Sequence, residues 1–434
     1  MNRVLEKALK KVSDAELFII KVEKYPVSFS GNRLKSIKSS MTKGIGLRVN
    51  YKGRLGFSSD SDEGDPESLI SRAMASAVHG PECEFEFCKN HEITPVDLFD
   101  PRTVSFEIEE AVEMGEKMID HVVNSAPDTV NDLKITKFFI EVSYFADGVE
   151  KTYYKTLLTR QMSSLRVTPE GFIYISEEDA SCRIPEDTLA PSRRIIEKIP
   201  LTQFSFEMPS RPTTVIFHPK SVGNLIEPLT AGLSGINLLS GMSPLVGKYN
   251  RWILDQRFSL ADDPTIALAY GSEGFDGDGL PRKRMMLFDR GVLSNYLLDM
   301  YTASKLKMEP NACAQRGPDS PPAPGTTNLV VSSGDAPLKD MISSIKDGII
   351  VEEVIGGGQS NTIGGEFSVN VSLGFKVENG EVKGRVRNTM ISGNVYELLK
   401  NNLVALSTEV ETHNSITTPY FMFRDLSVAG KGSG

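Results

Sequence analysis

Glycine and proline divide the second half of this 434-residue chain into short segments. From residue 211 to 434, the segments between these residues have β-type composition. Two reversals, Asn379-Gly380 and Asp289 to Gly291, carry the residues that tight hairpin turns require. Short strands joined by tight turns pair with their neighbours in antiparallel order. The pattern therefore predicts a large, curved antiparallel sheet in this half of the chain.

Residues 1–90 have the pattern of helix, strands and helix. Two β-type segments follow a charged amphipathic opening: Glu16 to Val22 and Gly44 to Val49. Lys52-Gly53 lies between apolar flanks, which predicts a tight hairpin. Asp65 followed by Pro66 predicts the N-cap and the first position of a helix.

Residues 91–210 begin with apolar residues at helical spacing, which predicts a helix over Ser105 to Val123. Four β-type segments follow: Ile135 to Tyr144, Thr152 to Thr159, Ser163 to Val167 and Phe172 to Ile175. Asp147-Gly148 and Pro169 to Gly171 are suited to reversing the chain direction. We expect a β-meander.

The composition fits a globular protein of two or three domains, because 40% of the residues are apolar and 24% are charged. We predict an α+β chain in three parts. They are an N-terminal α+β domain (1–90), a central helix with a β-meander (91–210) and a large β-rich C-terminal domain with a curved antiparallel sheet (211–434).

Charge and hydropathy exclude several classes of function. The net charge is −9, and the densest basic groups, Arg282 to Arg284 and Lys383 to Arg387, are short and expected to be solvated. Nucleic-acid binding needs clustered Lys and Arg, so we do not expect it. No apolar run is long enough for a membrane span, and the run Leu17 to Ile20 is too short for a signal peptide. Four scattered cysteines fit a reducing cytoplasm.

The sequence lacks the usual ligands of a zinc peptidase. None of its five histidines lies within five residues of another, so H-E-x-x-H is absent, and His91-Glu92 leads into a proline. The four residues between Cys83 and Cys88 are at the upper limit of the spacing between metal ligands, and no second pair of cysteines or histidines follows. Two ordinary buried thiols are therefore favoured over a metal site. Metal ligands are therefore not predicted.

Few residues are candidates for other kinds of catalysis. No G-x-S-x-G turn occurs, and Cys313 is the one cysteine placed for thiol chemistry, although no histidine is near it in sequence. Asp276 and Asp278, near Asp262, Asp263 and Glu273, offer carboxylates to a hard cation. Position 287 of the loop is leucine where an EF-hand needs glutamate, so a solvated turn is favoured.

Two loops have open roles. The glycine-rich segment contains Gly356, Gly357, Gly358, Gly364 and Gly365. It is either a loop with positive φ angles or a stretch of bare backbone that an extended peptide can approach. Residues 308–327 carry five prolines and form an extended loop that is either functional or a surface connection.

Five blocks in a fixed order resemble the TldD/PmbA family, also known as putative modulators of DNA gyrase. They are GIGLRVNYKGRLGFSSDSD (44–62), GFDGDGLPRKRMMLFDRGVLSNYLLDMYTASKL (274–306), IVEEVIGGGQSNTIGGEFS (350–368), VENGEVKG (377–384) and ISGNVYELL (391–399). The resemblance covers most of the chain. It implies a metalloprotease assembly of two related subunits, of which the TldD type carries zinc through H-E-x-x-x-H and a downstream cysteine.

The segment VGNLIEPLTAGLSG (222–235) is similar to the region of that zinc motif. In the family, G-L-x-G follows the zinc motif. When the G-L-S-G of this segment is aligned with it, Ile226 and Ala231 fall at the positions of the two histidines, and Glu227 falls at the position of the catalytic glutamate. No cysteine occurs near residues 411–421, and His413 is expected to be an ordinary polar loop residue. The segment itself predicts a packing helix with Glu227 on its surface and an interruption or kink at Pro228. The resemblance thus implies the PmbA (TldE) type, without zinc of its own.

Three functional hypotheses remain. In the first, the chain is the non-catalytic partner of a TldD-like subunit that holds the zinc, and it helps to bind peptide substrates. In the second, it is a self-sufficient homodimer that binds peptides or a regulatory protein without cleavage. In the third, the acidic cluster around Asp276 and Asp278 supports metal chemistry.

Overall fold

The computed structural model describes residues 2–62, 64–169, 171–358 and 360–430. The N-terminal part contains α1 (Arg3–Leu9), β1 (Asp14–Ser30), β2 (Arg33–Ile37), β3 (Ser40–Tyr51), β4 (Arg54–Asp60) and α2 (Pro66–Ala77). The central part contains α3 (Pro101–Ser105), α4 (Ile108–Ser125), β5 (Thr129–Ala146), β6 (Val149–Thr168), β7 (Gly171–Ser181) and α5 (Ala190–Lys198). The mixed helix and strand content confirms the α+β prediction.

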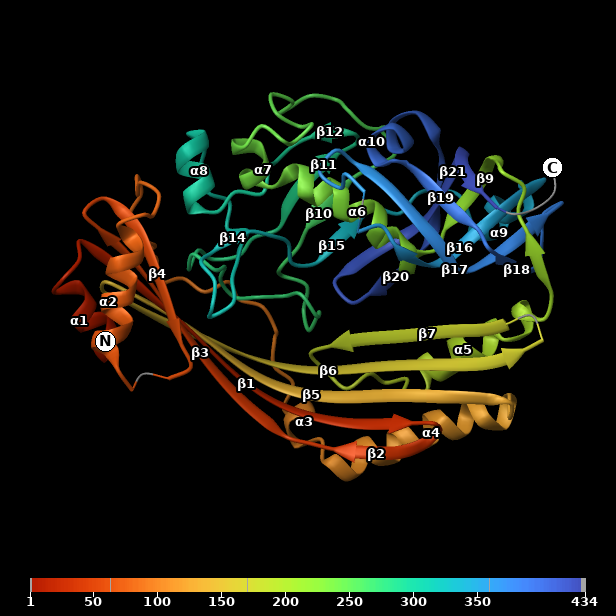
Figure 1. Cartoon of the computed structure of the whole chain (residues 1–434), viewed down its shortest axis with the longest axis horizontal. Helices are drawn as coiled ribbons and strands as arrows, with labels where there is room; N and C mark the ends of the chain where they lie inside the picture. The colour runs from red at the N-terminus through yellow and green to blue at the C-terminus, as the bar shows by residue number, and fades with distance from the viewer. Residues whose placement is uncertain (1, 63, 170, 359, 431–434) are drawn as a thin grey trace.

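The N-terminal and central strands form one antiparallel sheet in the order β4-β3-β1-β5-β6-β7, with β2 beside β1. β1 pairs with β5 from Glu16 to Phe29, so the sheet is continuous across residue 90. The long strands curve beneath the C-terminal part, and α4 and α5 pack against them, behind the sheet in this view (Figure 1). The domain division at residue 90 remains a prediction, but the sheet does not stop there.

Local turn and cap chemistry was predicted correctly. The Asp65 side chain accepts a hydrogen bond from the Ser68 amide at the start of α2. Lys52 and Gly53 both have positive φ, as do Asn379 and Gly380. Asp147-Gly148 joins β5 to β6, as predicted. The other predicted turn, at 169–171, falls where β6 ends and β7 begins, and its residue Glu170 lies outside the described residues.

Two boundaries differ from the prediction. α4 begins at Ile108 because Glu107 and Glu110 form a capping box there. The two strands expected between Thr152 and Val167 are one strand, β6. The charged residue Arg160 does not interrupt this strand, because its side chain is buried and donates two hydrogen bonds to the carboxylate of Asp179 (2.9 and 2.6 Å).

The C-terminal part forms a second sheet that is mostly antiparallel, as predicted. Its strands are β8 (Ser205–Glu207), β9 (Arg211–Phe217), β10 (Leu260–Asp262), β11 (Met285–Asp289), β12 (Val292–Leu293), β15 (Leu329–Val331), β16 (Asp347–Gly356), β17 (Glu366–Glu378), β18 (Glu381–Arg387), β19 (Met390–Asn394), β20 (Leu403–His413) and β21 (Ile416–Ala429). β9 lies parallel to β16 and antiparallel to β21.

Helices pack on this sheet and build the main core. They are α6 (Pro219–Leu233), α7 (Gly235–Leu239), α8 (Met300–Leu306), α9 (Leu338–Ser343) and α10 (Val395–Glu397). The buried side of α6, including Leu225, Leu229 and Leu233, joins Phe217 and Phe421 of the sheet in one apolar cluster. Among the described residues, no helix combines the length and the apolar composition that a membrane crossing requires.

The proline-rich segment 308–327 connects the two sheets. It contains β13 (Ala314–Gln315) and β14 (Ala323–Pro324), which pair with each other. Arg316 is fully buried, and its Nη1 donates to Glu16 of β1 at 2.7 Å. Pro318 lies so close to Gly44 that a Cβ there would meet its ring at 2.3 Å. The segment therefore makes buried contacts to the first sheet through Arg316 and Pro318, although other parts of it are exposed.

Candidate functional site

Helix α6 carries the positions that resemble the zinc motif. It begins at His218, whose Nδ1 accepts the amide N–H of Lys220 (3.1 Å). Ile226 is buried in the core, whereas Glu227 is exposed on the opposite side, as predicted. The helix is not interrupted at Pro228, because buried neighbours on both sides hold it against the sheet.

A pocket of about 240 Å³ brings Glu227 together with Gly356, Gly357 and Gly358. It lies between α6 and the end of β16, and its remaining lining residues are Asn224, Pro228, Thr362, Glu366, Phe367 and Val369. The predicted residues Gly364 and Gly365 are not among the lining residues. Two features singled out separately in the sequence thus share one pocket.

The backbone around this pocket explains its shape. Gly356 and Gly357 have φ angles of +97° and +94°, which side-chain-bearing residues rarely adopt. β16 pairs with β9 only as far as Val351, so its last residues have β17 as their strand partner on one side. The strand therefore ends in bare, bent backbone next to the helix that carries Glu227.

The cysteines are poorly placed for chemistry. Cys313 is 1% exposed, and burial raises the pKa of its thiol well above the ordinary value. Cys88 Sγ donates to the Gly279 carbonyl (3.3 Å) and Cys83 Sγ donates to that of Phe85 (3.2 Å). A thiolate nucleophile needs a lowered pKa and access, and Cys313 has neither.

The acidic cluster is buried, so the predicted solvated turn is wrong. Asp276 accepts backbone N–H groups from Asp278 (3.0 Å), Leu280 (2.7 Å) and Ala314 (3.0 Å). Burial raises the pKa of Asp276 to about 7. Asp278 pairs with Arg48 of β3 at 2.6 Å. Both carboxylates hold the loop to the rest of the fold.

One of the basic residues predicted to be solvated belongs to the same region. Arg282 is 2% exposed and donates through Nε to Glu273 (3.0 Å) and through Nη1 to the Ala312 carbonyl (2.7 Å). Its partner carboxylate neutralises the charge, which allows the guanidinium to be buried.

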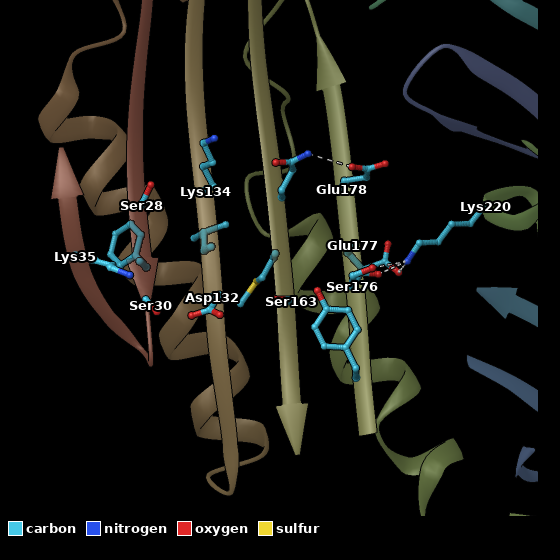
Figure 2. Close-up of a pocket in the computed structure, with 15 residues that line it drawn as sticks. Ser28, Ser30, Lys35, Asp132, Lys134, Ser163, Ser176, Glu177, Glu178 and Lys220 are labelled. Carbon is cyan, nitrogen blue, oxygen red and sulfur yellow. Dashed lines mark hydrogen bonds and ion pairs between the residues drawn. The ribbon is translucent and has the colours of Figure 1, made fainter. Parts of the chain in front are cut away.

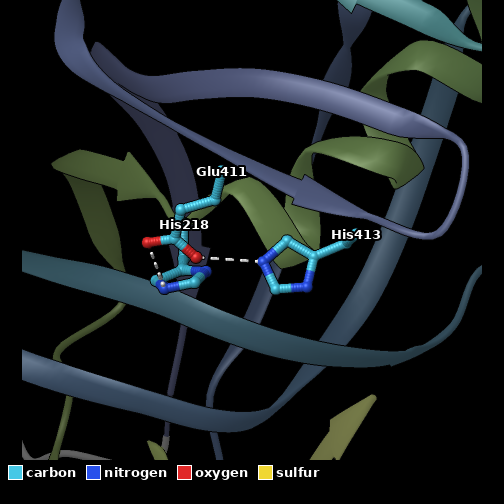
Figure 3. A group of neighbouring side chains, drawn as sticks. All are labelled: His218, Glu411 and His413. Carbon is cyan, nitrogen blue, oxygen red and sulfur yellow. Dashed lines mark hydrogen bonds and ion pairs between the residues drawn. The ribbon is translucent and has the colours of Figure 1, made fainter. Parts of the chain in front are cut away.

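His413 is not an ordinary loop residue, contrary to the prediction. It ends β20 and lies beside Glu411 and His218, the residue that caps α6 (Figure 3). The ring centroids of the two histidines are 5.8 Å apart. No pattern in the sequence points to this group, because His218 is far from Glu411 and His413 in the chain.

A second pocket, of about 520 Å³, lies where β7 faces the C-terminal part. Ser28, Asp132, Lys134 and Ser163 line it from successive strands of the first sheet, and Lys220 reaches it from α6 (Figure 2). The lining mixes polar and apolar side chains and carries both signs of charge.

Glu177 of β7 anchors this region electrostatically. Its carboxylate pairs with Arg194 (2.6 Å) and with Lys198, and Lys220 lies at 3.7 Å. Burial by itself would raise the pKa of Glu177, but the three cations outweigh it and lower the pKa to about 2.

This lowered pKa predicts how stability depends on pH. The pKa is lower in the folded than in the unfolded chain, so the stabilisation is present above the ordinary glutamate pKa of 4.5 and is lost as pH falls toward 2. Between pH 6 and pH 3, the loss expected from Glu177 is about 2 kcal/mol. Urea unfolding of the wild type and of Glu177→Gln at pH 6 and pH 3 measures it. The variant should be less stable than the wild type at pH 6, but its free energy of unfolding should fall less between pH 6 and pH 3. An equal fall in both proteins would contradict the lowered pKa of Glu177.

Comparison with known families supports the architecture. The model of the PmbA/TldA metallopeptidase C-terminal domain matches residues 210–430, and the model of domain 1 of the same metallopeptidases matches residues 15–77.

Individual proteins match along the whole chain. The metalloprotease PmbA of Escherichia coli O157:H7 is 22% identical, over 99% of this chain and 95% of its own length. An uncharacterised protein of Methanocaldococcus jannaschii is also 22% identical, over 98% of both chains. The crystal structure of TldE from Thermococcus kodakarensis superposes with a TM-score of 0.88 at 21% identity, covering 98% of this chain and 99% of that one. A putative modulator of a DNA gyrase from Thermotoga maritima gives the same TM-score and identity, with 98% of both chains covered. These likenesses establish the fold.

Proposed function

The chain belongs to the TldD/PmbA metallopeptidase family, as a member of the PmbA (TldE) type, and we propose that it is the non-catalytic subunit of a peptidase. In this proposal it binds peptide substrate and pairs with a TldD-like subunit that carries the zinc. The observation that carries the proposal is the chemistry of α6. Ile226 and Ala231 offer only hydrocarbon at the positions where the resemblance puts zinc-binding histidines.

The pocket at Glu227 supports a role in peptide binding. The end of β16 lacks side chains from Gly356 to Gly358, so the backbone of an extended peptide can approach closely. Ile355, just before the glycines, is 60% exposed and offers apolar contact. Glu227 can accept a hydrogen bond from a peptide N–H or ammonium group. Main-chain recognition of this kind tolerates varied sequences.

Filling this pocket is expected to weaken peptide binding. A Cβ at Gly358 would meet no atom within 4 Å, and its φ angle is not in the left-handed region, so valine adds volume without backbone strain. We expect Gly358→Val to raise the Kd for a fluorescein-labelled unstructured decapeptide about tenfold or more. Fluorescence anisotropy of the chain mixed with its zinc-bearing partner measures the change. Gly358→Ala, the control that adds only one methyl group, should show a smaller effect, and an unchanged Kd in both variants would exclude this pocket.

An exposed apolar segment supports the pairing of subunits. Between residues 236 and 252 the chain exposes six large apolar side chains: Ile236, Leu239, Met242, Val246, Tyr249 and Trp252. Concentrated exposed apolar surface of this kind marks protein interaction sites. In the proposal, this segment contacts the partner subunit.

The second candidate is a stand-alone homodimer that binds peptide without cleavage, and the same apolar segment favours it. Purification of the tagged chain from its native cells separates the two candidates, since the first requires a zinc-bearing relative in equal amount. Trp252 is the single tryptophan of the chain and is 64% exposed, so its emission reports on homodimers during dilution of the pure protein. A homodimer without any relative would contradict the leading proposal.

A further inference from the structure

Three potential metal ligands meet where α6 begins. His218 follows the last residue of β9 and caps the helix, while Glu411 and His413 lie near the end of β20. Residues i and i+2 of a strand point to the same face, so Glu411 and His413 project together toward His218. The Glu411 carboxylate lies beside both imidazole rings (Figure 3).

The distances are those of a compact ligand set. One ligand atom from each residue can be chosen so that all lie within 4.8 Å of one another. Glu411 Oε2 is 3.1 Å from His413 Nε2, and Glu411 Oε1 is 3.7 Å from His218 Nε2. The histidine side chains are 10% and 11% exposed, and that of Glu411 is 34% exposed. An ion can therefore reach the group from the side of the carboxylate.

The charges around the group favour a cation. The Glu411 carboxylate lies beside both imidazole rings and supplies the negative charge that a divalent cation needs. A second carboxylate, Glu352, lies 3.5 Å from His218 Nε2 and pairs with Lys198.

The surroundings hold the ligands in place. The Tyr420 hydroxyl donates to Glu411 Oε1 (2.6 Å), and its ring lies 4.9 Å from that of His218. The Nδ1 atom of His413 is buried and has no hydrogen-bond partner among the described residues. The hydrogen bonds among these residues therefore leave one nitrogen of the His413 ring without a partner.

We propose that His218, Glu411 and His413 bind a divalent transition-metal ion of the zinc class. Two imidazoles and one carboxylate are a ligand set that such ions accept, with a fourth position open to water. The site is separate from the positions of Ile226 and Ala231, which lie two and more turns further along α6. Bound metal would join the start of α6 to the end of β20.

Coordination through Nε2 of His218 changes one contact. The proton of the neutral ring then moves to Nδ1, which can no longer accept the Lys220 amide. Metal binding therefore replaces one helix-cap bond with a coordinate bond. This exchange predicts that the Lys220 amide resonance shifts when metal is added.

Cobalt(II) titration of the full chain tests the proposal, because this ion substitutes for zinc and has visible absorption that reports its ligands. We expect one bound ion per chain that zinc displaces. Both His413→Ala and Glu411→Gln should weaken binding at least about 100-fold. Glu411→Gln keeps the size and an acceptor for Tyr420, so it separates loss of a ligand from loss of the fold.

The controls are His79→Ala and His91→Ala, which change exposed histidines outside the group and should leave the titration unchanged. Cobalt that does not bind to the wild type, or that binds equally to Glu411→Gln and His413→Ala, would overturn the proposal. The readout is a spectrum and not activity, so it stands apart from the test of the peptidase role.

Discussion

Replacing Glu16 by alanine is expected to lower the free energy of unfolding by about 3–5 kcal/mol. Glu16 is fully buried, and its carboxylate lies 2.9 Å from Arg48 Nε and 2.7 Å from Arg316 Nη1. It also accepts the Tyr144 hydroxyl at 2.9 Å. Its removal leaves two buried guanidinium groups with too little negative charge near them, which is among the most destabilising single changes.

Urea unfolding at neutral pH measures this loss. Glu113→Ala is the matched control, because Glu113 also pairs with a basic residue, Lys117 (2.6 Å), but is 65% exposed on α4. Exposed pairs four residues apart in a helix contribute about 0.3–0.5 kcal/mol. A loss below about 1 kcal/mol for Glu16→Ala would show that the buried cluster does not hold segment 308–327 to the first sheet.

Local features of the fold were predictable from the sequence because their causes are local. The turns at Lys52-Gly53 and Asn379-Gly380 need residues that tolerate positive φ, and the cap at Asp65 needs a short acceptor side chain. These requirements are met within a few residues of chain. The corresponding predictions were correct.

Features that depend on distant partners were not predictable. The gap predicted between the strands Thr152 to Thr159 and Ser163 to Val167 contains Arg160, whose partner Asp179 lies on the next strand. Asp276 and Asp278 looked solvated because Arg48 and the Ala314 amide, which pair with them, are far away in the sequence. A single sequence shows a charged residue but not the opposite charge that allows its burial.

The candidate peptide site was predictable in parts. Glu227 was singled out by the family resemblance and Gly356 to Gly358 by their bare backbone, but their shared pocket depends on how α6 packs beside β16. The group of His218, Glu411 and His413 was missed, because no spacing in the sequence links the start of a helix to the end of a strand.

The largest effect expected on activity comes from adding the partner. Ile226 and Ala231 offer no zinc ligands, and His218, Glu411 and His413 do not line the Glu227 pocket, so the chain alone should not activate water against a peptide bound there. In the proposal, the zinc-bearing subunit supplies the metal centre to which peptide bound at the Glu227 pocket is presented. We expect hydrolysis at least about 1000-fold faster for the mixture than for the chain alone.

The most direct test is a peptidase assay with a fluorogenic unstructured peptide, using the chain alone, the zinc-bearing subunit alone and their equimolar mixture. Each is measured with added zinc and with a chelator. The account predicts activity in the mixture that exceeds the sum of the separate subunits and disappears with chelator, while the chain alone stays at background even with zinc. Zinc-dependent hydrolysis by the chain alone, at a rate close to that of the mixture, would contradict it.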